Sequence, residues 1–312
     1  MYRIGVDLGG TNIAAGIVSG DGKILIKKSV PFVIRETHDE VANDIVGLVN
    51  ALFEEGGISA AQIISLGIGG PGTMDPPRGM ILTAHNLKLY NMPVSHMLQR
   101  VLKLPVYVEN DANCAALGES AFGAARGSKF SITITLGTGV GGGIIIGGRI
   151  YSGPFFAAGE MHQVIRADGR MCTCGRPGCW EEYASARGLI HEVTSRLQRL
   201  QSSKILAMAD GDVSNISPKT VFAALDAGDS FAAYVIEQYI DNLCIGIGNL
   251  INILQPEIIV IGGGISGRGQ SLADGINARL LDMVFGRDLR TKIAIAKLGN
   301  DAGIIGAAML NK

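Results

Sequence analysis

Two hairpin patterns of the same layout stand about 130 residues apart in this chain of 312 residues. The first covers residues 2–18 and turns at Gly9-Gly10-Thr11, and the second covers 132–146 and turns at Gly137-Thr138-Gly139. A supersecondary unit that is repeated along a chain predicts two structurally similar halves. The alternative is that two glycine-rich hairpins coincide by chance in an α/β protein.

The remaining segments alternate between helical and strand periodicity. Apolar residues at helical spacing predict a helix over 38–53 and a long one over about 231–254, which Gly56-Gly57 and Pro256 end. Buried strands are expected at 63–68, 106–109 and 258–261, and a helix of small residues at 302–310. This order of elements is typical of a two-domain α/β protein.

Charge and composition exclude several classes of protein. The 27 Lys+Arg residues nearly balance the 28 Asp+Glu residues, which argues against a nucleic-acid surface or a polybasic membrane anchor. The longest uncharged run, 130–148, is rich in Ser, Thr and Gly and fits a strand–turn–strand better than a membrane span. No basic segment or cleavage site follows Met1, so we expect a cytoplasmic protein.

Three of the five cysteines fall within eight residues, at Cys172, Cys174 and Cys179. A secreted disulfide framework does not have this odd, clustered pattern. Three thiolates in one tight loop suit four-coordinate zinc, with His162 as the fourth ligand. A site closed by four protein ligands predicts a structural zinc ion.

Three glycine segments follow predicted strands, at Gly9-Gly10-Thr11-Asn12, Gly137-Thr138-Gly139 and Gly262-Gly263-Gly264. Phosphate binding needs backbone N–H groups that point to one place without side chains in the way. Asp7 precedes the first segment and is placed to hold Mg²⁺ through water. The segments match neither a Walker A loop nor a complete dinucleotide fingerprint, but together they predict a nucleotide site.

Carboxylates supply the candidate chemistry. Asp111 follows a strand, at the edge where ligands of α/β proteins bind, and is suited to accept a hydroxyl proton during phosphoryl transfer. Its alternative role is to cap the next helix, although Asn110 or Asn113 can do so instead. Glu160 and Glu181 flank the cysteine loop and are suited to accept hydrogen bonds from vicinal hydroxyls. The alternative for Glu181-Glu182 is a solvated first helical turn.

Taken together, these segments resemble the ROK family of sugar kinases and sugar-responsive repressors. The resemblance covers essentially the whole chain. It rests on motifs in six places: Asp7-Leu-Gly-Gly-Thr-Asn12, Glu109-Asn-Asp-Ala-Asn113, Leu136-Gly-Thr-Gly-Val-Gly-Gly-Gly143, Gly159-Glu160 with His162, Cys172-x-Cys174-Gly-x-x-Gly-Cys179, and Glu181-x-Tyr183-Ala-Ser185.

The resemblance implies a duplicated actin-like ATPase (RNase H-like) fold, with two domains around a cleft. We expect one domain at 1–118 plus 301–312 and the other at 119–300. The implied activity is that of an ATP-dependent hexokinase of glycolysis that phosphorylates the 6-hydroxyl, most like the bacterial glucokinases. N-acetylhexosamine, mannose, allose and fructose remain alternative acceptors, and a non-catalytic sugar sensor is a further alternative.

The resemblance also implies roles for individual residues. Asp111 is the expected base. The expected sugar ligands are Asn86, Asn110, Asp111, Glu160, His162 and Glu181. The expected contacts to ATP and Mg²⁺ are Asp7, Gly9, Gly10, Thr11, Asn12, Gly137, Thr138, Gly139, Gly262, Gly263 and Gly264. The expected zinc ligands are His162, Cys172, Cys174 and Cys179, so that His162 serves both sites.

Two features bear on these expectations. The family spaces its glutamate and histidine as Glu-x-x-His, whereas Glu160-Met161-His162 is one residue shorter, which puts the metal and sugar contacts of His162 in question. A repressor of this family would carry a DNA-binding segment before the first glycine turn, and only six residues precede Asp7. We therefore expect a kinase that binds neither nucleic acid nor membrane and forms a homodimer or homotetramer.

Overall fold

The structure is a computed structural model that describes residues 1–311, with Leu197 described by its backbone alone. The chain divides into two compact units. Unit 1 comprises Met1–Thr133, Gly142–Glu160 and Ala296–Lys312, and unit 2 comprises Ile134–Gly141 and Met161–Ile295. The domain boundaries that we expected near residues 118 and 301 remain a prediction.

Unit 1 is built on a five-stranded sheet of order β3-β2-β1-β4-β8. The strands are β1 (Tyr2–Leu8), β2 (Asn12–Val18), β3 (Ile24–Pro31), β4 (Ile63–Gly70) and β8 (Val106–Asn110). The first three are antiparallel, and β4 and β8 continue the sheet in parallel with β1. The predicted opening hairpin and the predicted strands of this half are therefore confirmed.

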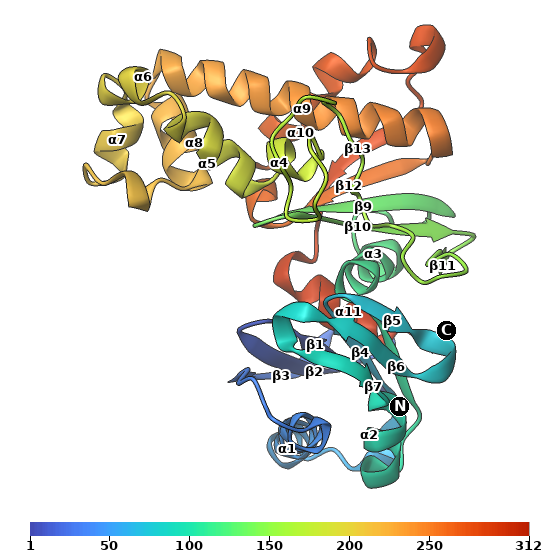
Figure 1. Cartoon of the computed structure of the whole chain (residues 1–312). Coiled ribbons are helices and arrows are strands. Elements are labelled where there is room, and N and C mark those ends of the chain that lie inside the picture. The colour runs from blue at the N-terminus through green and yellow to red at the C-terminus, as the bar shows by residue number, and fades with distance from the viewer. Residues whose placement is uncertain (312) are drawn as a thin grey trace. The chain divides into compact units, whose positions relative to one another are not determined.

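Helices cover both faces of this sheet (Figure 1). They are α1 (His38–Gly56), α2 (Val94–Leu102), α3 (Asp111–Phe122) and α11 (Ala302–Ala308). A capping box of Thr37 and Glu40 begins α1, and Gly57 in the left-handed conformation ends it, as the glycine pair in the sequence predicted. In Figure 1, α1 and α2 lie on one side of the sheet, and α3 and α11 on the other.

A small three-stranded sheet in unit 1 was not predicted from the sequence. It contains β5 (Thr73–Asp75), β6 (Met80–Ala84) and β7 (Leu89–Met92) in antiparallel order. These strands are short and lie among Gly and Pro residues, so their period-2 pattern is weak. The sheet matters for the site because Asn86 lies on the turn between β6 and β7.

Glycines allow α11 to lie directly on the sheet and on α3. A Cβ at Gly5 of β1 or Gly67 of β4 would lie 1.8 Å from a carbonyl oxygen of α11. A Cβ at Gly306 of α11 would lie 1.7 Å from the carbonyl oxygen of Cys114 in α3. The contact is therefore backbone against backbone, and no larger residue fits at these three positions.

The second five-stranded sheet has the order β11-β10-β9-β12-β13. Its strands are β9 (Phe130–Leu136), β10 (Val140–Ile146), β11 (Arg149–Ile150), β12 (Ile258–Gly262) and β13 (Lys292–Ile295). As β1 lies between β2 and β4 in the first sheet, so β9 lies between β10 and β12 in the second. The equivalent strand orders confirm the duplication that the two hairpins predicted.

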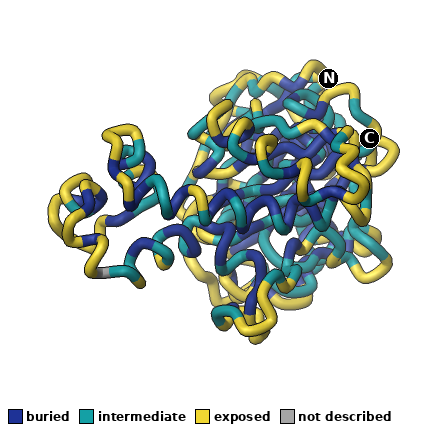
Figure 2. The backbone as a smooth tube through the Cα atoms, turned by 90° about the horizontal axis from the view of Figure 1, so that it is seen from above, coloured by how far each residue is buried: buried dark blue, intermediate teal, exposed yellow. Residues whose placement is uncertain are grey.

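Unit 2 also contains seven α-helices among its described residues: α4 (Glu181–Ala184), α5 (Ala186–Thr194), α6 (Leu197–Gln201), α7 (Lys204–Met208), α8 (Pro218–Asp226), α9 (Ser230–Leu254) and α10 (Gln270–Leu280). The long helix α9 has the predicted extent, and its buried positions recur along its whole length. Figure 2 shows buried backbone along the elements and exposed residues mainly in the connections. No helix in the described part of the chain is both long and apolar enough to cross a membrane.

The crossing of α11 on α3 yields a stability prediction. Gly306→Ala should lower the free energy of unfolding by about 2–3 kcal/mol, because the new methyl group must displace the backbone of α3. Gly47→Ala is the matched control, since Gly47 lies inside α1 with no atom within 4 Å of the added Cβ. That control should gain about 0.5–1 kcal/mol. Urea denaturation measures the free energy of unfolding of each variant. Equal values for the two variants would show that α11 and α3 do not need glycine at position 306 to pack.

Candidate functional site

The junction of β8 and α3 presents Asp111 at the first helical position of α3. Asn110 is the N-cap, because its side-chain oxygen accepts hydrogen bonds from Ala112 N (2.9 Å) and Asn113 N (3.2 Å). The amide of Asn110 donates to the carbonyl of Gly72 at 3.1 Å. The cap therefore belongs to Asn110, and Asp111 Oδ1 shares the Ala112 N–H, from which it accepts a hydrogen bond at 2.8 Å.

Asp7 and Asp111 are both buried acids of unit 1, and the charge of Asp111 acts on Asp7. Burial raises the pKa of Asp7 to about 6, the charge of Asp111 adds to the rise, and Lys27 opposes it. Burial also raises the pKa of Asp111, and the hydrogen bond from Ala112 N lowers it by a smaller amount. Oxygen ligands from paired carboxylates are what Mg²⁺ prefers, directly or through water. The pair thus fits the base and metal roles that the sequence suggested.

The same acids surround a thiol that the sequence analysis did not connect with them. Cys114 is fully buried one turn into α3, and its pKa is raised well above its usual value by burial and by the charges of Glu109, Asp111 and Asp7. A buried, protonated thiol is a poor nucleophile. Cys114 therefore acts here as a packing residue behind the acids.

The first glycine turn is exposed and closed by one backbone bond, from Gly9 N to Asn12 O at 2.9 Å. The side chain of Asn86 lies beside this turn, since a Cβ at Gly10 would be 3.5 Å from its amide nitrogen. Of the predicted sugar ligands, Asn86 is thus placed next to the predicted phosphate ligands of the same unit.

Glu160 ends the part of unit 1 that follows β11. The residue before it, Gly159, has φ of +96°, and its Cβ would lie 3.0 Å from Gly142 O and 3.5 Å from Asn113 Oδ1. Only glycine tolerates this conformation and this close approach. The backbone that leads to Glu160 is therefore held against the first turn of α3, where Asp111 also lies.

Unit 2 brings two of the predicted nucleotide-binding segments together. Gly263 (φ +82°) follows β12, and a Cβ there would lie 2.4 Å from the carbonyl oxygen of Leu136. Leu136 ends β9 and directly precedes the turn at Gly137-Thr138-Gly139. The two glycine segments are thus adjacent in unit 2.

Glu181 begins α4 and is bonded to the same glycine turn. Its Oε2 accepts a hydrogen bond from Val140 N at 3.0 Å, and its Oε1 lies 3.3 Å from Arg187 Nη2. A Cβ at Gly139 would lie 2.4 Å from Oε2, so the glycine leaves space for the carboxylate. The alternative of a solvated helical turn is wrong for Glu181, whose side chain is only 14% exposed.

The cysteine loop gathers a complete ligand set for a metal. One ligand atom each from His162, Cys172, Cys174 and Cys179 lies within 4.8 Å of the others. The Cys174 and Cys179 sulfur atoms are 3.4 Å apart, near the separation of about 3.8 Å that tetrahedral Zn–S bonds of about 2.3 Å require. The Arg176 backbone N–H lowers the pKa of Cys174 to about 6, which favours the thiolate.

The one-residue shortening between Glu160 and His162 does not remove His162 from this cluster. Neighbouring bonds fix its backbone: Arg176 donates to His162 O at 2.7 Å, and Trp180 N donates to Gln163 O at 2.7 Å. The Gln163 side chain is bonded to Gly246 O and to the Asn249 amide on α9. The shorter loop is thus anchored to α9 through Gln163, a residue that the sequence analysis overlooked.

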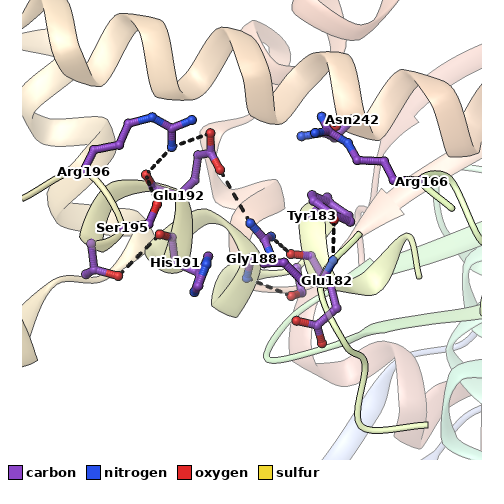
Figure 3. A network of polar contacts seen from close by, with 12 residues as sticks. Arg166, Glu182, Tyr183, Gly188, His191, Glu192, Ser195, Arg196 and Asn242 are labelled. Carbon is purple, nitrogen blue, oxygen red and sulfur yellow. Dashed lines mark hydrogen bonds and ion pairs between the residues drawn. The ribbon is translucent and has the colours of Figure 1, made fainter. Parts of the chain in front are cut away.

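A second anchor holds the other part of the loop (Figure 3). The guanidinium groups of Arg166 and Arg170 lie over the Tyr183 ring, 4.7 and 4.2 Å from its centre. Arg166 donates to Asn242 Oδ1 at 2.9 Å, and Arg170 pairs with Glu192 at 3.6 Å. Because these partners lie on α4, α5 and α9, the loop and the helix that carries Glu181 form one polar network.

The two equivalent sheets, with glycine turns and carboxylates after their strands, place the chain in the class of the actin-like ATPase fold. A family model described as "ROK family" matches residues 3–312. The chain belongs to the ROK family.

Among curated relatives, a glucokinase of Halalkalibacterium halodurans is 38% identical, over 100% of this chain and 95% of its own length. A xylose repressor of Caldicellulosiruptor bescii is 30% identical, over 97% of this chain and 76% of the repressor. Among solved structures, a ROK family glucokinase from Streptomyces griseus in complex with glucose and AMPPNP has a TM-score of 0.83 and 36% identity, with 99% of each chain covered.

The coupling of the two acids predicts a measurable titration. In carboxyl ¹³C NMR, Asp7 should titrate near pH 6, because burial and the Asp111 charge oppose its ionisation. Asp111→Asn should lower that midpoint, since it removes the like charge. A wild-type midpoint near 3.8, the usual value for Asp, would contradict the raised pKa, and an unchanged midpoint in Asp111→Asn would show that the Asp111 charge does not act on Asp7.

The ligand cluster predicts one bound zinc ion per chain. Cys174→Ser should lower the zinc content and the melting temperature, because a structural zinc site contributes directly to folding. Cys244→Ser serves as the control, since Cys244 is buried in α9 and is not among the residues of the cluster. Elemental analysis and calorimetry measure both effects, and purified protein without zinc would rule out the site.

Proposed function

We propose that this chain is an ATP-dependent hexokinase that transfers the γ-phosphoryl group to the 6-hydroxyl of a hexose, with glucose as the favoured acceptor. The support is the family, the glucokinases among its relatives, and the residues that the two units present. N-acetylmannosamine kinase of Escherichia coli, at 29% identity, shows that related chains are named for other sugars.

The observation that carries the proposal is the state of Asp111. Its carboxylate begins α3 without serving as the cap, burial raises its pKa, and Asp7 lies within electrostatic reach. A carboxylate whose pKa is raised towards neutrality is a better proton acceptor than an exposed one. Asp111 would take the proton of the hydroxymethyl group as its oxygen attacks the γ-phosphorus in line, and ADP would leave.

The other residues bind and orient the two substrates. Hydroxyl groups of the sugar would be bound by Asn86, Asn110, Glu160, His162 and Glu181. Backbone N–H groups and small side chains would hold the phosphates at Gly9, Gly10, Thr11, Asn12, Gly137, Thr138 and Gly139. The adenosine would lie near Gly262, Gly263 and Gly264. Glycine is suited to the phosphate positions because the chain must approach the oxygens closely.

Two metal ions complete the proposal. Asp7, with Asp111 nearby, fits Mg²⁺, which neutralises charge on the transferred phosphoryl group when it is bound. The cysteine loop fits zinc, and its anchors to α4 and α9 would keep His162 and Glu181 in place. A homodimer or homotetramer in the cytoplasm, acting in glycolysis, remains part of the proposal.

The decisive test is a coupled assay of ADP release with ATP across a panel of hexoses. Wild-type protein should be most active on glucose, and N-acetylmannosamine, mannose, allose and fructose are the competing acceptors. Inactivity on every sugar of the panel would contradict the proposed kinase.

Within this assay, Asp111→Ala should lower kcat by at least about 100-fold, the usual scale for loss of a general base. Sugar affinity and melting temperature should change little. Asp39→Ala is the control. Asp39 lies in the first turn of α1 as Asp111 lies in the first turn of α3, but Asp39 is exposed. Near-normal turnover of Asp111→Ala would refute the assignment of the base.

A further inference from the structure

Three acidic groups crowd together where α4 begins. The carboxylates of Glu181 and Glu182 and the thiol of Cys172 each have a ligand atom within 4.8 Å of the others. The two glutamate side chains are only 14% and 13% exposed. The charges of the two glutamates repel each other, and this repulsion is stronger in a partly buried site than in water. A positively charged side chain beside both carboxylates offsets it.

Arg187, on the first turn of α5, supplies the cation. Its Nη2 lies 2.7 Å from Glu182 Oε1 and 3.3 Å from Glu181 Oε1. One guanidinium nitrogen thus contacts both carboxylates, and the guanidinium stays charged at any pH at which the protein is folded. Arg187 thus holds one oxygen of Glu181 towards α5.

The other oxygen of Glu181 is held by the glycine turn. Val140 N donates to Oε2 at 3.0 Å, and the absence of a side chain at Gly139 leaves the space for it. The start of α5 is bonded to the same turn, because Ala186 N donates to Gly137 O at 2.9 Å. The turn, Glu181 and Arg187 therefore form one closed set of bonds within unit 2.

We propose that Arg187 is a positioning residue for Glu181 and thereby sets the affinity of the enzyme for its hexose. This inference rests on the proposed function, in which Glu181 accepts hydrogen bonds from sugar hydroxyls. Arg187 fixes the orientation of the carboxylate and keeps it from swinging away from Glu182 and Cys172. Because Glu181 is also bonded to the turn at Gly139, the effect should extend more weakly to the KM for ATP.

The competing explanation is that Arg187 makes an ordinary ion pair that only stabilises the fold. Arg196 provides a matched control, since it also belongs to unit 2 and pairs with Glu192 at 2.6 Å. The two arginines are comparably exposed, at 42% for Arg187 and 32% for Arg196. A purely structural role would make Arg187→Gln and Arg196→Gln behave alike in kinetics and melting temperature.

The experiment uses the full chain with its metal and measures kcat, KM for glucose, KM for ATP, zinc content and melting temperature. Arg187→Gln should raise the KM for glucose about tenfold or more, the usual scale for losing a hydrogen bond to a charged group. Its kcat should stay within about threefold, because Asp111 is untouched. Arg187→Lys keeps the charge, but its shorter side chain ends before the position of Nη2, so it should raise the KM for glucose by a smaller factor. Arg196→Gln should leave all three kinetic constants unchanged.

A double-mutant cycle separates this inference from the proposed function. Glu181→Gln alone should raise the KM for glucose, and Arg187→Gln added to it should have an effect below about twofold, because Arg187 acts through Glu181. An unchanged KM in Glu181→Gln would refute the proposed role of Glu181 and with it the inference. A raised KM in Glu181→Gln, with an unchanged KM in Arg187→Gln, would overturn the inference alone. If Arg187→Gln loses its zinc, the KM for glucose of Arg187→Lys is the deciding measurement. A wild-type KM for glucose in Arg187→Lys also overturns the inference.

Discussion

The capping of α3 by Asn110 is the interaction on which the candidate site depends. The first N–H groups of a helix need acceptors, and Asn110 satisfies two of them from the end of β8. Because Asn110 accepts from Ala112 N and Asn113 N, the cap does not depend on Asp111, whose Oδ1 shares the Ala112 N–H at 2.8 Å. Glu109 supports the arrangement from behind, since its buried carboxylate accepts hydrogen bonds from Asn110 N and from the Asn113 amide.

At several places in both units, glycine lets other parts of the chain approach the backbone closely. Gly306 allows α11 to rest on α3, and Gly5 allows it to rest on β1, the strand that carries Asp7. In unit 2, Gly263 lies against the end of β9, and Gly139 makes room for Glu181. Part of the high glycine content of 44 residues thus serves close approach between elements.

Much of this could be predicted from the sequence, because the signals were local. Strong periodicity predicted α1 and α9, and the repeated hairpins predicted the two equivalent sheets. The spacing of Cys172, Cys174 and Cys179 predicted the ligand cluster, because the ligands lie within one short loop.

What could not be predicted depends on contacts between distant parts of the chain. The sheet of β5, β6 and β7 has strands too short for a clear pattern. Nothing in the sequence pairs Gln163 with Asn249, and the bond from Glu181 to Val140 joins residues 41 positions apart. Arg187 was likewise overlooked, since an arginine near the start of a helix has no distinctive pattern until its two acidic partners are placed beside it.

The most direct test of the central claim is a crystal structure with glucose and a non-hydrolysable ATP analogue bound. The account predicts that a carboxylate oxygen of Asp111 lies about 2.6–3.2 Å from the 6-hydroxyl oxygen, which in turn faces the γ-phosphorus. An Asp111 side chain directed away from that hydroxyl, with another group within hydrogen-bond distance of it, would contradict the account.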